Sequence, residues 1–283
     1  MTRVFSCIFV LALCFTFPAY AQTRGAEVEY SDGETTLKGY INSPLARYGV
    51  YKIPAVIIVH EWWGHNDYVR KRADMITEEL GYVAFAIDMF GDGKLAEHPK
   101  DAQKFVAEVA STAGLREKRF RAAIEYLKTR KEVDVDKIVA IGYCFGGSTV
   151  LDMIRSGVPL QAGVSFHGSL SSGIKAKKIE TPIFVAHGEA DTFITKEQIA
   201  AFKKEMREAE APLEWVSYTG AKHSFTNPDA DEFAKKFGIN VGYNERADKD
   251  SWEKMKDFFN RKFPNYFREF RIERAPGGGI IEH

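Results

Sequence analysis

The stretch KIVAIGYCFGGSTV, residues 137–150, decides the fold class. Residues 137–141 form a short apolar run rich in β-branched side chains, and a helix-like segment follows the glycine pair Gly146-Gly147. Apolar runs of this length are typical of strands that helices cover on both faces. The stretch therefore predicts a buried strand, a turn at Cys144 and a helix.

The same kind of apolar run recurs along the chain. Five further runs predict core strands, at 55–59, 82–87, 162–166, 182–186 and 214–218. Ahead of them, the segments 26–33 and 35–44 predict an N-terminal hairpin.

Helical patterns fill the gaps between the runs. They include 67–81, a long helical region that ends near residue 130, a segment opened by a capping box of Thr195 and Gln198, and a last helix near 252–259. Strands that alternate with helices indicate parallel βαβ units. We therefore expect an α/β fold with a mostly parallel, doubly wound sheet and helices on both faces.

The first 21 residues have the layout of a secretory signal peptide. A basic start at Arg3 is followed by the apolar run 4–20 and by the small-x-small pattern Ala19-Tyr20-Ala21. A membrane anchor is the alternative, but Pro18 interrupts the run, which is short for a span of ~20 apolar residues. A lipoprotein signal at Cys14 is disfavoured by the bulky Leu13 before it. We expect cleavage after Ala21 and a secreted or periplasmic protein.

The remaining chain suits one domain. Residues 22–270 have a length that a single α/β domain can reach, and we expect the glycine-rich segment 271–283 to be a loose tail. The 39 basic and 39 acidic residues balance, which gives no argument for nucleic acid or an acidic membrane surface. After signal cleavage no stretch predicts a membrane span. No cofactor is expected, and the oligomeric state is left open, a monomer included.

Three cysteines occur in the sequence, at positions 7, 14 and 144. The first two lie in the predicted signal peptide, so the mature protein would keep only Cys144 and form no internal disulfide. A lone thiol in an oxidising compartment needs an explanation. Burial as a small apolar side chain is one, and function is the other.

Cys144 lies in a pattern typical of a nucleophile. The segment GYCFGG has the form G-x-C-x-G-G, which matches the spacing of the strand-to-helix nucleophile elbow. Its glycines, Gly142 and Gly146, tolerate an unusual backbone and let the helix approach the strand. At a helix N-terminus, backbone N–H groups and the helix dipole favour a thiolate. A buried structural cysteine remains the alternative on this motif alone.

A nucleophile needs a base, and the base needs an acid that orients it. Ligand sites of open α/β sheets lie at the carboxyl ends of the strands, and both Asp191 and His223 follow predicted strands. They also follow Cys144 in the order nucleophile, acid, histidine. Glu189 competes with Asp191 for the acid. Taken singly, each residue could also cap a helix or lie on the surface.

The segment HEWWGH, residues 60–65, matches a zinc-binding motif only superficially. Two zinc-binding histidines on a helix lie four residues apart, but here Gly64 holds that position and His65 comes one later. The segment also follows a strand, so we expect no metal.

Four segments together resemble the dienelactone hydrolase family of α/β-hydrolases. HEWWG, GYCFGG, HGEAD and GAKHSF occur in the family's order within about residues 25–263. The resemblance implies an α/β-hydrolase fold and hydrolysis of a carboxylic ester or lactone, a carboxymethylenebutenolidase-like activity. It implies a triad of Cys144, Asp191 and His223, and a thioester acyl-enzyme.

The resemblance assigns three further groups. Glu61 would contact the resting thiol and gate its activation, where a solvated strand-end carboxylate is the plain alternative. The backbone N–H of Trp62 would form the oxyanion hole together with that of Phe145, which elbow geometry also predicts.

The sequence departs from the family in its arginines. The namesake enzymes hold a carboxylated lactone with arginines from two regions, which here read DMFGDGK and HSFTNPD and contain no arginine. Lys94 lies in the first region but lacks the bidentate fork of arginine. Aromatic side chains suggest instead a pocket for an aromatic or apolar ester or lactone. The candidates, which could also simply fill the core, are Trp62, Trp63, Phe90, Phe145 and Phe225.

His60 and His167 also follow predicted strands, and we assign them structural roles. Two functions from other classes stay open. One is a non-catalytic binding protein on a hydrolase scaffold, which the missing arginines favour. The other is a periplasmic thiol sensor based on Cys144, for which no resolving cysteine is present.

Overall fold

The computed structural model describes residues 23–44, 52–264 and 266. Their strands form one sheet of eight in the order β1-β2-β4-β3-β5-β6-β7-β8. The strands are β1 (Thr23–Ser31), β2 (Thr36–Pro44), β3 (Ile53–Val59), β4 (Val83–Ile87), β5 (Val133–Tyr143), β6 (Gly163–Phe166), β7 (Ile183–Gly188) and β8 (Leu213–Tyr218).

The sheet is antiparallel only at its N-terminal edge. β1 and β2 form the hairpin expected from the sequence, and β2 also runs antiparallel to β4. All other neighbours are parallel, from β4 and β3 through to β7 and β8. The predicted mostly parallel α/β sheet is therefore confirmed.

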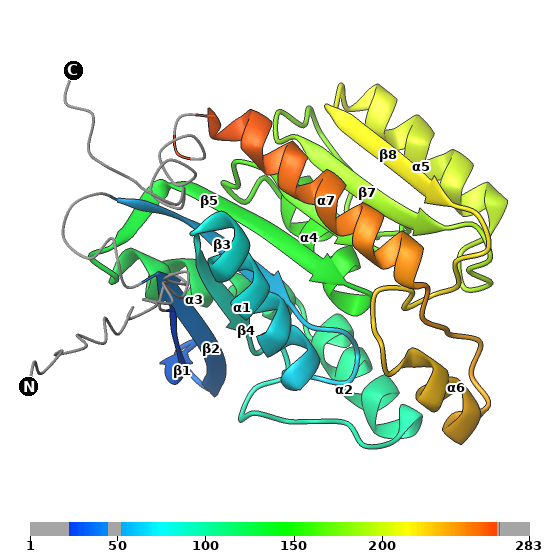
Figure 1. Cartoon of the computed structure of the whole chain (residues 1–283), viewed down its shortest axis with the longest axis horizontal. Helices are drawn as coiled ribbons and strands as arrows, with labels where there is room; N and C mark the ends of the chain where they lie inside the picture. The colour runs from blue at the N-terminus through cyan, green and yellow to red at the C-terminus, as the bar shows by residue number, and fades with distance from the viewer. Residues whose placement is uncertain (1–22, 45–51, 265, 267–283) are drawn as a thin grey trace, which may run out of the picture.

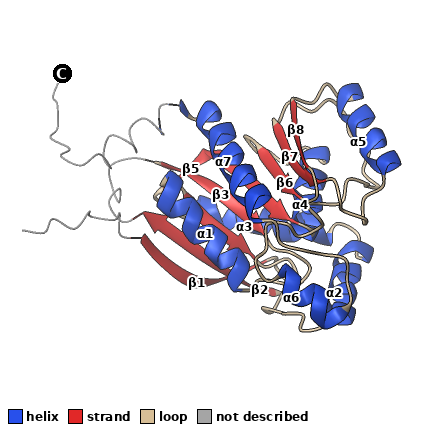
Figure 2. Cartoon of the chain, turned by 45° about the vertical axis from the view of Figure 1, so that its right-hand side comes forward, coloured by secondary structure: helices blue, strands red, loops and turns tan. Residues whose placement is uncertain are grey.

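Helices cover both faces of this sheet (Figure 1). α1 (Asp67–Leu80) and α7 (Glu245–Lys262) lie in front of it in that view, and α3 (Leu115–Lys128) and α4 (Phe145–Arg155) lie behind. α5 (Lys196–Glu208) packs beside β8, where the rings of Phe202 and Trp215 are 6.1 Å apart. Two further helices, α2 (Pro99–Ser111) and α6 (Ala230–Phe237), lie near the ends to which the parallel strands point (Figure 2).

The helices depart from the sequence expectation in two places and agree with it in one. The long helical region before residue 130 is two helices, because Gly114 takes a left-handed φ of 73° between α2 and α3. The capping box of Thr195 and Gln198 is present at the start of α5, with both reciprocal hydrogen bonds. α6 was not predicted, since its eight residues are short for a periodic pattern.

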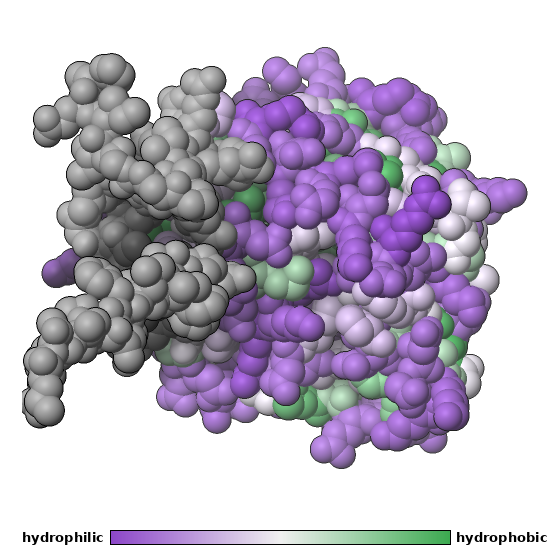
Figure 3. Space-filling model, in the orientation of Figure 1, coloured by the Kyte–Doolittle hydropathy of each residue, from purple (hydrophilic) through white to green (hydrophobic). Residues whose placement is uncertain are grey.

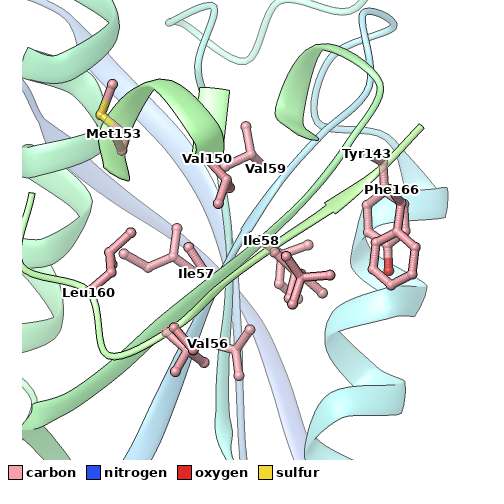
Figure 4. Close-up of a cluster of buried hydrophobic side chains, with 14 of the residues drawn as sticks. Val56, Ile57, Ile58, Val59, Tyr143, Val150, Met153, Leu160 and Phe166 are labelled. Carbon is pink, nitrogen blue, oxygen red and sulfur yellow. The ribbon is translucent and has the colours of Figure 1, made fainter. Parts of the chain in front are cut away.

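The central strands form the core. Every residue of β3 and of β4 is buried, which explains their continuous apolar sequence. Figure 4 shows side chains of this core, including Tyr143 and Phe166 at the ends of β5 and β6. These two residues are partners in the strand register, and their rings stack at 4.8 Å with planes 8° apart. The stack fixes the two strand ends that precede Cys144 and His167.

The face seen in Figure 3 is mostly hydrophilic, with apolar side chains scattered over it. Among the described helices, none has both the length and the apolar character needed to cross a bilayer. The predicted signal peptide, residues 1–21, and the predicted tail, 271–283, lie outside the described residues.

Candidate active site

Cys144 occupies a strained turn between β5 and α4. Its φ is 53° and its ψ is −114°. Residues other than glycine adopt such a backbone conformation at a cost of about 1–3 kcal/mol. Gly146 permits this turn, because a Cβ atom there would lie 2.1 Å from the Val59 carbonyl oxygen of β3. The helix can therefore start directly against the neighbouring strand. This is the local geometry of a nucleophile elbow.

The backbone of Cys144 is held from the side of β6. Its N–H lies 3.0 Å from the Phe166 carbonyl and 3.1 Å from His167 Nδ1. His167 is buried, and burial lowers its pKa well below the usual value, so the ring is neutral and Nδ1 can accept. Its Nε2–H then donates to Thr226 Oγ1 at 2.7 Å. His167 thus links the elbow to the loop that follows His223.

His223 and Asp191 form a hydrogen-bonded pair. His223 Nδ1 lies 2.8 Å from Asp191 Oδ2, and the Phe193 N–H donates to the other oxygen, Oδ1, at 2.8 Å. Burial acts to lower the pKa of His223, but the hydrogen bonds and negative charges of Cys144 and Asp191 outweigh it and raise that pKa well above normal. The groups on both sides of the ring, Cys144 and Asp191, therefore favour the imidazolium form of His223.

The structure separates the two candidate acids. Glu189, the competitor of Asp191, is exposed and accepts a hydrogen bond from Thr219 Oγ1 at 2.7 Å. Asp191 is buried and holds His223. Asp191 is the carboxylate that can orient the imidazole.

Glu61 lies beneath the loop that carries His223. Its carboxylate is buried and accepts from Ser224 Oγ at 2.8 Å and from Asn227 Nδ2 at 2.6 Å. Burial raises the pKa of Glu61, and the two hydrogen bonds oppose that rise only in part. Both carboxylate oxygens are thus occupied by residues of the His223 loop, whereas the thiol contact implied by the family stays a prediction.

Three non-glycine residues around the site share a left-handed backbone. The φ angles of Cys144, His167 and Ser224 are 53°, 40° and 58°. They come from three separate strand ends, after β5, β6 and β8. His167 connects them, because its ring bonds the Cys144 N–H on one side and Thr226, two residues after Ser224, on the other.

A cavity of about 480 Å³ opens over Cys144 and His223. Its walls come from the segment after β3, from α2, from the starts of α3 and α4, and from the loops after β6 and β7. The lining residues are Trp62, Gln103, Val106, Ala107, Arg116, Cys144, Phe145, Ser148, Ser169, Ser171, Phe193, Ile194, His223 and Val241.

Of the five predicted aromatic lining residues, only Trp62 and Phe145 line this cavity. Trp63 packs against Phe233 and Phe237 of α6 in a separate small cluster. Phe90 and Phe225 are also buried: Phe90 packs against His60 and Phe105, and Phe225 packs against His167 and Tyr218. For these three residues, the core-filling alternative holds, because their rings are buried against other side chains and do not line the cavity.

Two informative lining residues were not anticipated. Phe193 is 52% exposed, and its ring meets the His223 ring edge-on at 5.1 Å. Arg116 comes from the first turn of α3, a region that no strand-end rule singles out. Lys94, in contrast, is paired with Glu108 at 3.4 Å and does not line the cavity.

His60 fits a structural role. It is buried, and burial lowers its pKa, so one ring nitrogen accepts while the other donates. Nε2 accepts from the Met89 N–H at 3.2 Å, and Nδ1 faces the Glu61 carbonyl. Within the described part of the chain, no three histidine, cysteine or acidic side chains are grouped as metal ligands.

The arrangement suits nucleophilic attack on a carbonyl. Phe145 is the first residue of α4, and the first N–H groups of a helix lack intrahelical acceptors. Its N–H can therefore stabilise negative charge beside the Cys144 sulfur. The neighbouring His223 can transfer a proton, and Asp191 keeps the imidazole in one orientation.

Comparisons with known proteins place the chain among hydrolases of similar sequence and fold. The dienelactone hydrolase family profile matches residues 37–263. The Protein usf of Aquifex pyrophilus is 28% identical over 243 residues, covering 83% of this chain and 97% of that protein. Two solved structures each cover 84% of this chain and are themselves covered to 98%. A dienelactone hydrolase-like promiscuous phosphotriesterase from metagenomic libraries has 30% identity and a TM-score of 0.77, and m3DLH has 33% identity and a TM-score of 0.77.

Proposed function

The chain belongs to the dienelactone hydrolase family, whose members are hydrolases of ester or lactone bonds, and we propose that it acts through a Cys144–His223–Asp191 triad. One observation carries the proposal: a cysteine on a strained strand-to-helix turn shares a cavity with a histidine whose other ring nitrogen is bound by a buried aspartate. A buried structural cysteine would need neither the strain nor the paired histidine.

The reaction proceeds in two halves. The Cys144 thiolate attacks the carbonyl carbon, and the resulting oxyanion accepts hydrogen bonds from the backbone N–H groups of Phe145 and Trp62. The oxyanion then collapses, the carbon–oxygen bond breaks, and the His223 imidazolium protonates the departing alkoxide. A thioester on Cys144 remains.

In the second half His223 acts as the base. It takes a proton from water, which attacks the thioester carbonyl, and the acid product leaves as the thiolate and imidazolium are restored. Each oxyanion donor is worth about 3 kcal/mol of transition-state stabilisation in such sites. Asp191 keeps the imidazole in the tautomer and orientation that both proton transfers require.

Glu61 has a linked role in this proposal. Glu61 restrains the resting Cys144 thiol until substrate displaces the Glu61 carboxylate, as the family resemblance implies. Its hydrogen bonds to Ser224 and Asn227 supply a route for that change, because they tie the carboxylate to the loop of His223.

The reacting group is the carbonyl of an uncharged ester or lactone linkage. Support comes from the apolar and aromatic side chains around the nucleophile, among them Trp62, Phe145 and Phe193.

The test combines turnover with detection of the acyl-enzyme. Wild-type protein is mixed with p-nitrophenyl butyrate, and the reaction is followed for a burst of p-nitrophenol and, by intact mass after acid quenching, for a butyryl adduct on Cys144. Cys144→Ala should keep its circular dichroism and lose both signals. A variant as fast as wild type would refute the mechanism. Wild-type protein that neither releases p-nitrophenol nor gains an adduct across diverse esters would favour a binding protein.

We also propose that the protein is exported. Support comes from the basic start, apolar run and cleavage pattern of residues 1–21. Expression of the full chain in a Gram-negative host, followed by fractionation and N-terminal sequencing, should give a periplasmic protein that begins at Gln22. An uncleaved protein in the cytoplasm would contradict this.

A further inference from the structure

Arg116 brings a cationic side chain to the wall of the cavity that contains Cys144. It comes from the start of α3, and its guanidinium lies over the ring of Phe145 at 5.5 Å. Phe145 is the residue directly after the nucleophile. Arg116 is therefore adjacent to the acylation site, although it is distant from Cys144 in the sequence.

The guanidinium of Arg116 is only partly used within the protein. Nη1 is paired with Asp152 Oδ2, and the side chain is 22% exposed. Its Nε is buried and has no hydrogen-bond partner in the described chain. Nη2 likewise forms no hydrogen bond within the described residues, so the partly exposed guanidinium keeps donors for a ligand.

Asp152 does not belong to Arg116 alone. Its other oxygen, Oδ1, lies 3.2 Å from Arg155 Nη1. Arg155 is also bound by both oxygens of Glu205 at 2.8 Å. Asp152 thus keeps a cationic partner if Arg116 is removed or turns toward a ligand.

The chemistry of the proposed triad indicates which side of the cavity holds the leaving group and which side holds the acyl group. The leaving oxygen must lie near His223, which protonates it, and Phe193 and Val241 line the cavity beside this histidine. The acyl group stays on Cys144 and has the remaining wall, where Phe145, Ser148 and Arg116 lie. The leaving side is apolar, and the acyl side carries the cation.

We propose that Arg116 forms an acyl-side subsite for a carboxylate. This inference rests on the proposed function and narrows its substrate class to esters or lactones whose acyl part ends in a second, ionised carboxyl group. Planar guanidinium and carboxylate groups form paired, charge-assisted hydrogen bonds. The unpartnered donors of Arg116 match such a group, while Phe193 and Val241 would contact an uncharged alcohol part.

Three p-nitrophenyl esters with one leaving group test the subsite. They are the glutarate half-ester, which is anionic, its methyl-capped diester, which is neutral and polar, and the hexanoate, which is apolar. For wild type, kcat/KM should be about tenfold or more higher for the half-ester than for either neutral ester, since hydrogen bonds between charged groups are the strong class. High salt should reduce this preference.

Variants of Arg116 are compared by the ratio of half-ester to hexanoate kcat/KM. Arg116→Met should lower the ratio about tenfold or more, and Arg116→Lys should lower it less, because lysine keeps the charge without the fork. Arg121→Met is the matched control: Arg121 lies on the same helix, is exposed, pairs with Glu117 at 2.7 Å, and does not line the cavity. Its ratio should equal that of wild type.

The outcomes separate the subsite from the general mechanism. Wild-type turnover of hexanoate without preference for the half-ester would overturn the subsite and leave the triad standing. An Arg116→Met variant that slows all three esters equally would assign Arg116 a structural role and would also overturn the subsite. If Arg116→Met does not fold, the ratio of Arg116→Lys decides. Failure of wild type to hydrolyse any ester would instead refute the proposed function.

Discussion

Ser224 Oγ lies 2.8 Å from Glu61 Oε1, and Ser224 directly follows His223 in the chain. A buried carboxylate is thereby attached to the loop that carries the proposed base. Asn227 completes the attachment from the same loop, at 2.6 Å from Oε2. The protonation state of Glu61 is therefore coupled to the conformation of that loop.

We predict that Glu61→Gln stabilises the protein at neutral and alkaline pH. Burial raises the folded-state pKa of Glu61 above its usual 4.5, so folding favours the protonated form. The resulting stabilisation is full below pH 4.5 and is lost as pH rises through the folded-state pKa. The loss amounts to about 1.4 kcal/mol for each pH unit that separates the two pKa values. Glutamine stays neutral and can still bond Ser224 and Asn227.

Urea unfolding from pH 4.5 to 9 measures this effect. The advantage of Glu61→Gln over wild type should grow with pH, with Glu189→Gln as the exposed control. A pH-independent difference would contradict the prediction.

We predict that the His223 imidazolium titrates above pH 6.5 and that this depends on Cys144. Burial opposes the imidazolium, and the negative charges of Cys144 and Asp191 overcome it, which places the pKa above the usual 6.5. Cys144→Ala removes one of these two charges, so the pKa of His223 should fall. NMR titration of the imidazole in wild type and variant measures both values. Equal values would show that the thiol does not contact the imidazole.

We predict that Asp191→Asn lowers kcat by about 10³–10⁴-fold and keeps the fold. An asparagine in this place no longer stabilises the imidazolium and favours the wrong tautomer of the histidine, which has an effect of this size in hydrolase triads. Glu189→Gln, two residues away, should leave kcat unchanged, because Glu189 bonds Thr219 and not His223. Comparable losses in the two variants would refute the assignment of the acid.

We predict that Gly146→Ala destabilises the protein by about 1–3 kcal/mol or more, as overpacked cores do. The added Cβ would lie 2.1 Å from the Val59 carbonyl, so α4 would have to move away from β3 and displace Cys144. Gly173→Ala is the control, because a Cβ there meets nothing within 4 Å. Thermal unfolding and ester turnover should both fall for the first variant only.

The sequence predicted the fold well, and it named three residues that lie together: Cys144 and His223 line one cavity, and Asp191 bonds His223. Buried parallel strands must be continuously apolar, as β3 and β4 are, so their ends mark where polar residues gather. Chain order along those ends was enough to propose Asp191 and His223. Motif position favoured Asp191 over Glu189, but both follow β7, and burial and hydrogen bonding are what tell them apart in the structure.

The cavity walls were harder to predict. Trp62 and Trp63 are adjacent, yet only Trp62 lines the cavity, while Trp63 packs on α6, a helix that the sequence did not reveal. Arg116 reaches the site from the first turn of α3, which begins after the left-handed Gly114, whereas α2 has already ended at Ser111. Side-chain direction at loops and helix starts depends on tertiary packing, which a linear pattern does not encode.

The left-handed turns at Cys144, His167 and Ser224 have a consequence for heat inactivation. Each turn is held in an unfavourable conformation by its neighbours, so the first thermal opening should relax these turns while the buried strands stay paired. We expect a temperature interval in which the protein is still folded by circular dichroism but inactive, and in which cooling restores activity. Durability of this enzyme would then be limited by three turns and not by its core.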